Sequence, residues 1–109
     1  MSLVTGMAIE FVLTAILMFV VMGVSTGAKE ETITAGLAVA ATIAMEAFVC
    51  GPLTKASMNP ARSLGPAVVS GDISRVWVYT IGPIAGALVG ASLYRIAKVS
   101  PRQPADAPA

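Results

Sequence analysis

The chain has 109 residues and a formal net charge of +1, and it is 56% hydrophobic but only 12% charged. A soluble domain carries about twice that charged share, so this composition predicts an integral membrane protein. The near-neutral charge and the small number of aromatic residues give no basis for a nucleic-acid partner. The sequence has no histidine and a single cysteine, which excludes a histidine–cysteine metal site, an internal disulfide and a catalytic cysteine–histidine pair. We therefore expect no enzyme activity, no cofactor and no bound metal.

Three apolar stretches, at about residues 3–25, 33–50 and 75–97, are each long enough to cross a bilayer as a helix, which takes roughly 20 residues. The first two carry one acidic residue each, Glu10 and Glu46. Gly51-Pro52 is expected to end the second helix. The tail at residues 100–109 is polar and rich in proline, and its composition predicts disorder.

Small residues mark the faces on which these helices are expected to pack. Gly82, Gly86 and Gly90 recur every four residues, so they share one face of the third helix. Small side chains allow two helices to approach closely in lipid, where no hydrophobic drive brings them together. The stripe therefore predicts helix packing rather than a ligand site.

The basic residues predict an orientation in the membrane. If the three spans alternate in direction, one side receives most of the positive charges and the other receives Arg75. The positive-inside rule then places the 27–32 turn and the C-terminus in the cytoplasm, in the plasma (inner) membrane. The residues on the cytoplasmic side are Lys29, Arg95, Lys98 and Arg102.

Residues 51–67, between the second and third apolar stretches, are too polar and too rich in turn residues to form a spanning helix. Asn59 is a preferred N-cap residue, and Pro60 fits the first position of a helix. We therefore expect an irregular loop as far as Met58 and a half-helix over residues 60–69. Irregular backbone at membrane depth is tolerated only inside protein or along a watery cavity, which indicates a pore or a binding site.

The chemistry of this stretch suits a selective path for uncharged solutes. The positive end of a half-helix at Asn59 disfavours cations, and the Asn59 amide can cap the helix while its NH₂ group faces a solute. Arg62 adds a permanent cation one turn later, unless its side chain merely reaches the membrane surface. A buried carboxylate at Glu10 is expected to accept hydrogen bonds from the loop. Glu46 has four possible roles: bracing the loop, reaching water at a helix end, pairing with Lys55, or facing the cavity.

The segment from Ser57 to Ala67, Ser-Met-Asn-Pro-Ala-Arg-Ser-Leu-Gly-Pro-Ala, resembles the second signature loop of the aquaporin (major intrinsic protein) family. The preceding Gly51-Pro52 and Ala56-Ser57 are most similar to the nodulin-26-like and bacterial branches. This resemblance implies an all-α membrane protein: an aquaporin-like C-terminal half repeat of three transmembrane helices and one re-entrant half-helix, over residues 1–99.

The resemblance also implies roles for individual residues. Two alanines would leave the selectivity filter wide, which favours small neutral solutes such as glycerol, urea or metalloid acids, together with water. Ser63 stands where glycerol facilitators of the family usually have Asp, so the solute stays open. The implied pore motif is Asn59, Pro60 and Ala61, the implied filter is Arg62, Ala56 and Ala47, and Glu10 would brace the loop.

The family builds its pore from two inverted repeats, and this chain resembles only the second. One half-helix cannot close a pore, so the chain is expected to be a fragment, to pair with a first-half repeat, or to assemble with itself, with a tetramer also possible. Two other readings remain. Half of an alternating-access transporter would show saturable, ion-coupled uptake, and a non-conducting membrane adaptor would keep its activity after Arg62→Ala or Asn59→Ala.

Overall fold

The computed structural model describes residues 2–25 and 31–97, and this part of the chain folds into four helices. Three of them, α1 (Leu3–Ser25), α2 (Glu31–Thr54) and α4 (Val76–Ala97), are long and apolar enough to cross a membrane. The 11 residues of α3 (Pro60–Ser70) rise about 16 Å, roughly half of the hydrocarbon core. The protein is therefore an all-α membrane protein with three spans and one half-helix. The predicted 100–109 tail and most of the predicted 27–32 turn lie outside the described residues.

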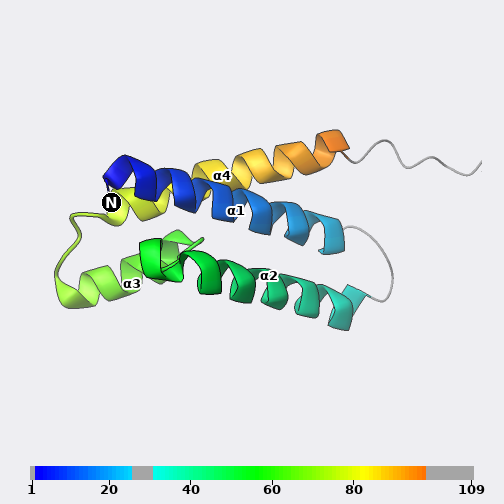
Figure 1. Cartoon of the computed structure of the whole chain (residues 1–109), viewed down its shortest axis with the longest axis horizontal. Coiled ribbons are helices and arrows are strands. Elements are labelled where there is room, and N and C mark those ends of the chain that lie inside the picture. Colours follow the sequence, from blue (N-terminus) through cyan, green and yellow to red (C-terminus); the bar gives the residue numbers. More distant parts are fainter. Residues whose placement is uncertain (1, 26–30, 98–109) are drawn as a thin grey trace, which may run out of the picture.

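The helices form a small bundle in which α1 and α4 run side by side in the same direction and α2 runs the opposite way (Figure 1). After α2 the chain turns back toward the middle of the bundle. Helix α3 then runs outward to the end of the bundle at which α1 and α4 begin (Figure 1). A span, a reversal and a half-length helix thus place the start of α3 midway along the bundle rather than at one end (Figure 1).

The glycine stripe of α4 brings its backbone against the backbone of α1, which confirms the predicted close packing. A Cβ atom added at Gly82 would lie 2.9 Å from the carbonyl oxygen of Met7. Added Cβ atoms at Gly86 and Gly90 would overlap the carbonyl groups of Phe11 and Ala15 still more closely. Only glycine lets the two helices approach this far.

Aromatic packing holds the other end of the same pair. The rings of Phe19 and Tyr94 meet edge to face with their centroids 5.6 Å apart. This separation and this geometry are the ones that aromatic pairs prefer. The α1–α4 pair is therefore fixed along its length by glycines at one end and by an aromatic contact at the other.

The prediction that Gly51-Pro52 ends the second helix is wrong, because α2 continues through both residues to Thr54. A proline within a helix removes the hydrogen bond of its own N–H, and the bonds of later residues can still form. Here the N–H of Lys55 donates to the carbonyl oxygen of Gly51 at 2.7 Å. The irregular loop is consequently shorter than expected and begins only at Lys55.

The hydrophobic core lies where α1 meets this loop. Its buried members are Leu13 of α1 with Ala56 and Met58 of the loop, and partly buried residues of α1 and α2 pack around them. Elsewhere the outer faces of the helices are apolar and exposed, as Phe48 at 86% and Leu37 at 66% exposure illustrate. The interior of this bundle thus serves mainly to hold the loop before α3.

Candidate functional site

A single carboxylate holds the loop that precedes α3. Glu10 of α1 is fully buried, and its Oε1 and Oε2 atoms accept hydrogen bonds from the N–H groups of Ser57 at 3.0 Å and Met58 at 2.8 Å. Each unpaired backbone N–H would cost several kcal/mol in a membrane interior, roughly 2–7 on transfer scales. Both oxygens of Glu10 therefore satisfy donors that no regular helix or sheet satisfies.

The loop itself adopts a backbone conformation that side chains other than glycine rarely take. Lys55, Ala56 and Met58 have φ angles of 67°, 45° and 55°, all in the left-handed region. The Oγ1 atom of Thr54 accepts a hydrogen bond from the N–H of Ala56 at 3.1 Å. Ala56 is 1% exposed and Met58 is 5% exposed. Burial, Thr54 and Glu10 together hold a local geometry that the loop sequence does not favour.

Asn59 caps α3 as its sequence position predicted. Its backbone is extended, with φ −160° and ψ 122°, and its Oδ1 atom accepts a hydrogen bond from the N–H of Ala61 at 2.8 Å. Pro60 occupies the first turn, and Gly71 with φ 82° closes the other end of the helix. Asn59 and Ala61 are exposed. The Asn59 side chain thus lies at the accessible, electropositive end of a helix dipole.

Arg62, in the first turn of α3, bonds back to the same loop. Its Nη1 atom is 3.4 Å from the carbonyl oxygen of Ser57, a long hydrogen bond, and its side chain is exposed. The hydroxyl of Ser63 donates to that of Ser57, which in turn donates to the carbonyl oxygen of Asn59 at 2.8 Å. These bonds connect the first turn of α3 to the loop and leave most of the Arg62 guanidinium free.

Two pockets lie on either side of the start of α3. A pocket of about 360 Å³ is lined by Arg62 and Lys55 together with residues from the 72–79 region. A second, of about 260 Å³, lies against Met58, Asn59 and Pro60 and is otherwise lined mostly by apolar residues of α1 and α4. The structure therefore brings Asn59 and Pro60 to one pocket and Arg62 to the other.

The two alanines of the implied filter line neither pocket. Ala47 is exposed on α2, whereas Ala56 is buried within the loop. Neither residue has a side chain larger than a methyl group. Any narrowing at these two positions must therefore come from backbone or from other residues.

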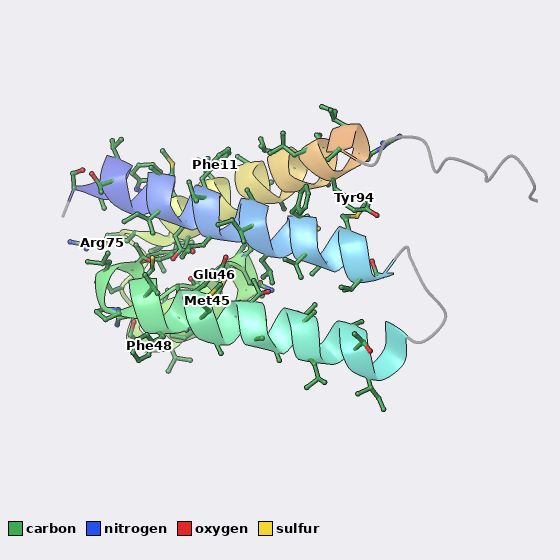
Figure 2. The ribbon with its side chains drawn as sticks, turned by 45° about the vertical axis from the view of Figure 1, so that its right-hand side comes forward. Phe11, Met45, Glu46, Phe48, Arg75 and Tyr94 are labelled. Carbon is green, nitrogen blue, oxygen red and sulfur yellow. The ribbon has the colours of Figure 1, made fainter. Side chains whose placement is uncertain are left out.

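Glu46 is buried, at 4% exposure, and neither of its carboxylate oxygens has a hydrogen-bond partner in the described part of the chain. Figure 2 shows it in the space between α2 and α1, whereas Phe48 of the same helix points away from the bundle. The suggestions that Glu46 braces the loop, reaches water or pairs with Lys55 are thus wrong. Its position on the inward face of α2 keeps it from the surface, and Lys55 is exposed.

Sequence reasoning missed the residues that complete the Arg62 pocket. The sequence placed Arg75 on one side of the membrane without linking it to Arg62, but Arg75 lines the pocket beside Arg62, as do Asp72 and Tyr79. The hydroxyl and the N–H of Ser74 both bond to the Asp72 carboxylate, at 2.7 and 3.1 Å, and they hold its pKa below the usual range, with help from nearby Arg75. The short connection between Ser70 and Val76 was the available signal, because it keeps the start of α4 close to α3.

Comparison with known proteins agrees with this geometry. The family model described as Major intrinsic protein matches residues 1–94. Aquaporin NIP1-1 of Oryza sativa subsp. japonica is 50% identical over 93 residues, which are 85% of this chain and 33% of that relative. Nodulin-26 of Glycine max is 45% identical over 89 residues, 82% of this chain and 33% of the relative. The chain thus spans about a third of the length of these curated relatives. Since the family model covers most of the sequence, the chain belongs to the major intrinsic protein family.

Proposed function

We propose that this chain forms the second half of a passive membrane pore for water and small neutral solutes. The observation that carries the proposal is the half-helix α3, which begins midway along the bundle (Figure 1) with an exposed Asn59 and is held there by Glu10. Membership of the major intrinsic protein family supports it, because members of that family are channels and not enzymes. The Oryza sativa relative is named as an aquaporin of the NIP type.

In this proposal Asn59, Pro60 and Ala61 form one half of the central constriction. The positive end of α3 repels cations at that point, and the free amide NH₂ group of Asn59 donates to passing hydroxyl or carbonyl groups. Arg62 adds a fixed cation at the outer mouth. These two positive charges therefore form electrostatic barriers that repel an inorganic cation but do not hinder a neutral solute.

The proposed solute class rests on the two alanines that the family resemblance assigns to the selectivity filter. With methyl groups at Ala47 and Ala56, the filter accommodates solutes wider than water, such as glycerol, urea or undissociated metalloid acids. Selectivity then rests on Arg62 and on the backbone of residues 55–57, which offer hydrogen bonds without closing the path.

A complete pore requires a first-half repeat, because one half-helix leaves one side of the path open. We propose that the partner is a first half in the same longer polypeptide, a separate chain, or a second copy in the opposite orientation, with a tetramer as the final assembly. The exposed Asn59 and Ala61 would face that partner. The basic residues Arg95, Lys98 and Arg102 support a cytoplasmic C-terminus in the plasma (inner) membrane.

The test is stopped-flow permeability of liposomes that contain this chain, alone and together with a first-half repeat, under water and glycerol gradients. We expect permeability above that of empty liposomes in at least one arrangement, and its loss in Asn59→Asp. Arg62→Val should admit larger solutes. Arg95→Val, in the last turn of α4 and away from the site, should leave selectivity unchanged. Saturable, ion-coupled uptake or unchanged flux in Asn59→Asp would reject the pore.

A further inference from the structure

Most of the basic side chains in the described part of the chain line the pocket beside Arg62. Four described residues are Lys or Arg, and Lys55, Arg62 and Arg75 all line this one pocket; the fourth, Arg95, lies in the last turn of α4. They come from three different elements: the loop, the first turn of α3 and the turn before α4. Three consecutive segments of the chain thus contribute to one cationic pocket of about 360 Å³.

These charges are only partly balanced within the described residues. Lys55 forms no ion pair there, and the guanidinium of Arg62 makes one long hydrogen bond, to the carbonyl oxygen of Ser57. Asp72 is the single acidic residue in the lining, and it already accepts two hydrogen bonds from Ser74. Three positive charges against one negative charge leave the pocket with a net charge of about +2. A concave site with charges of one sign concentrates ions of the opposite sign.

The available donors suit an oxyanion. Guanidinium groups bind phosphate oxygens through paired N–H donors, and an ammonium group adds a compact positive charge. Tyr79 also lines the pocket, and its hydroxyl makes no hydrogen bond with a described residue. These charges would add little to the binding free energy of an uncharged solute, whereas each of them would attract a phosphate group.

We propose that the pocket formed by Lys55, Arg62, Arg75 and Tyr79 binds a phosphate-type oxyanion at the outer mouth, either a free anion or the phosphate of a lipid headgroup. Arg75 lies at the end of the bundle where α1 begins (Figure 2), a place that a headgroup can reach. This goes beyond the proposed pore, because the anion binds at the mouth and does not pass through it. A variant can therefore lose anion binding and still conduct neutral solutes, or lose conduction and still bind the anion.

The experiment uses the full chain in an uncharged detergent and follows the fluorescence of Trp77, the only tryptophan, which is next to the pocket residue Val76. One arm titrates inorganic phosphate. The other titrates dioctanoyl phosphatidic acid against dioctanoylglycerol, which lacks the phosphate. Binding of inorganic phosphate supports a free oxyanion, and binding of phosphatidic acid alone supports a lipid headgroup.

Charge variants then locate the site. Lys55→Gln and Arg75→Gln should each weaken binding by up to about fivefold, the usual range for one exposed charge contact. Arg95→Gln removes a charge from the other end of α4 and should change nothing. Asp72→Asn keeps an acceptor for Ser74 but removes the opposing charge, so it should tighten binding.

Circular dichroism establishes that each variant keeps its helix content, so a loss of binding is not a loss of folding. The proposal is overturned if the folded chain binds neither probe. It is equally overturned if Arg95→Gln weakens binding as much as Arg75→Gln does, because the interaction would then be a general effect of charge.

Discussion

Replacing Gly86 by alanine should separate α1 from α4. The added Cβ would lie 3.0 Å from the carbonyl carbon of Phe11 and 3.1 Å from its Cα atom, with the carbonyl oxygen closer still. Carbon atoms attract best at about 3.5–4.0 Å, so the helices must move apart by roughly half an ångström or more. Because both groups are backbone, no side-chain rotation relieves the overlap. Overpacking of this kind costs about 1–3 kcal/mol.

Gly36→Ala is the matched control, because Gly36 also lies inside a spanning helix but has nothing within 4 Å of an added Cβ. There the substitution should stabilise the helix by about 0.5–1 kcal/mol, since alanine loses less backbone freedom than glycine. Both variants replace glycine by alanine, yet their effects on stability have opposite signs and should differ by about 1.5–4 kcal/mol.

The assay is unfolding by SDS in mixed micelles, followed by circular dichroism. We expect Gly86→Ala to unfold at a lower SDS fraction than the unmodified chain, and Gly36→Ala at an equal or higher one. Equal midpoints for both variants would refute the conclusion that backbone contact at the glycine stripe holds α1 against α4.

Four further substitutions test the loop, the end of α3 and the buried carboxylates by the same unfolding assay. Glu10→Gln keeps one acceptor oxygen for the two loop N–H groups, so it should cost about 1–3 kcal/mol of stability and leave solute selectivity unchanged; a change of selectivity alone would contradict the bracing role. Lys55→Gly should stabilise the chain by about 1 kcal/mol because Lys55 has a left-handed φ, whereas Gly71→Ala, which places a side chain at φ 82°, should destabilise it by a similar amount. Glu46→Leu should stabilise the isolated chain by about 1–3 kcal/mol because it removes a buried carboxyl without a partner; a loss of stability would show that the carboxyl is in fact satisfied.

The parts of this fold that local sequence determines were predictable. Apolar length predicted the spanning helices, and Asn59 followed by Pro60 predicted the start of α3, because both signals act within one or two helical turns. The stripe that includes Gly86 predicted close packing for a similar reason: helical periodicity alone puts such residues on one face.

The features that depend on distant residues were not predictable in the same way. The left-handed conformation of Lys55 is stable only because Glu10 and Thr54 hold the following residues of the loop. The last turn of α2, past Pro52, leads directly into this loop, and the N–H of Lys55 closes that turn on the carbonyl oxygen of Gly51. The cationic pocket depends on the turn that brings Arg75 beside Arg62. Each feature requires the tertiary arrangement first.

The hydrogen bonds of Glu10 to Ser57 and Met58 join residues 47 and 48 positions apart. During synthesis α1 enters the membrane before the loop exists, and Glu10 must stay without its final partners until α2 has followed. Spanning helices form individually and associate afterwards. The candidate pore is therefore assembled late: insertion comes first, pairing of the helices second, and the ordering of residues 55–58 last. A variant that slows the last of these steps would leave a chain that is fully inserted in the membrane but has no ordered entrance to its pore.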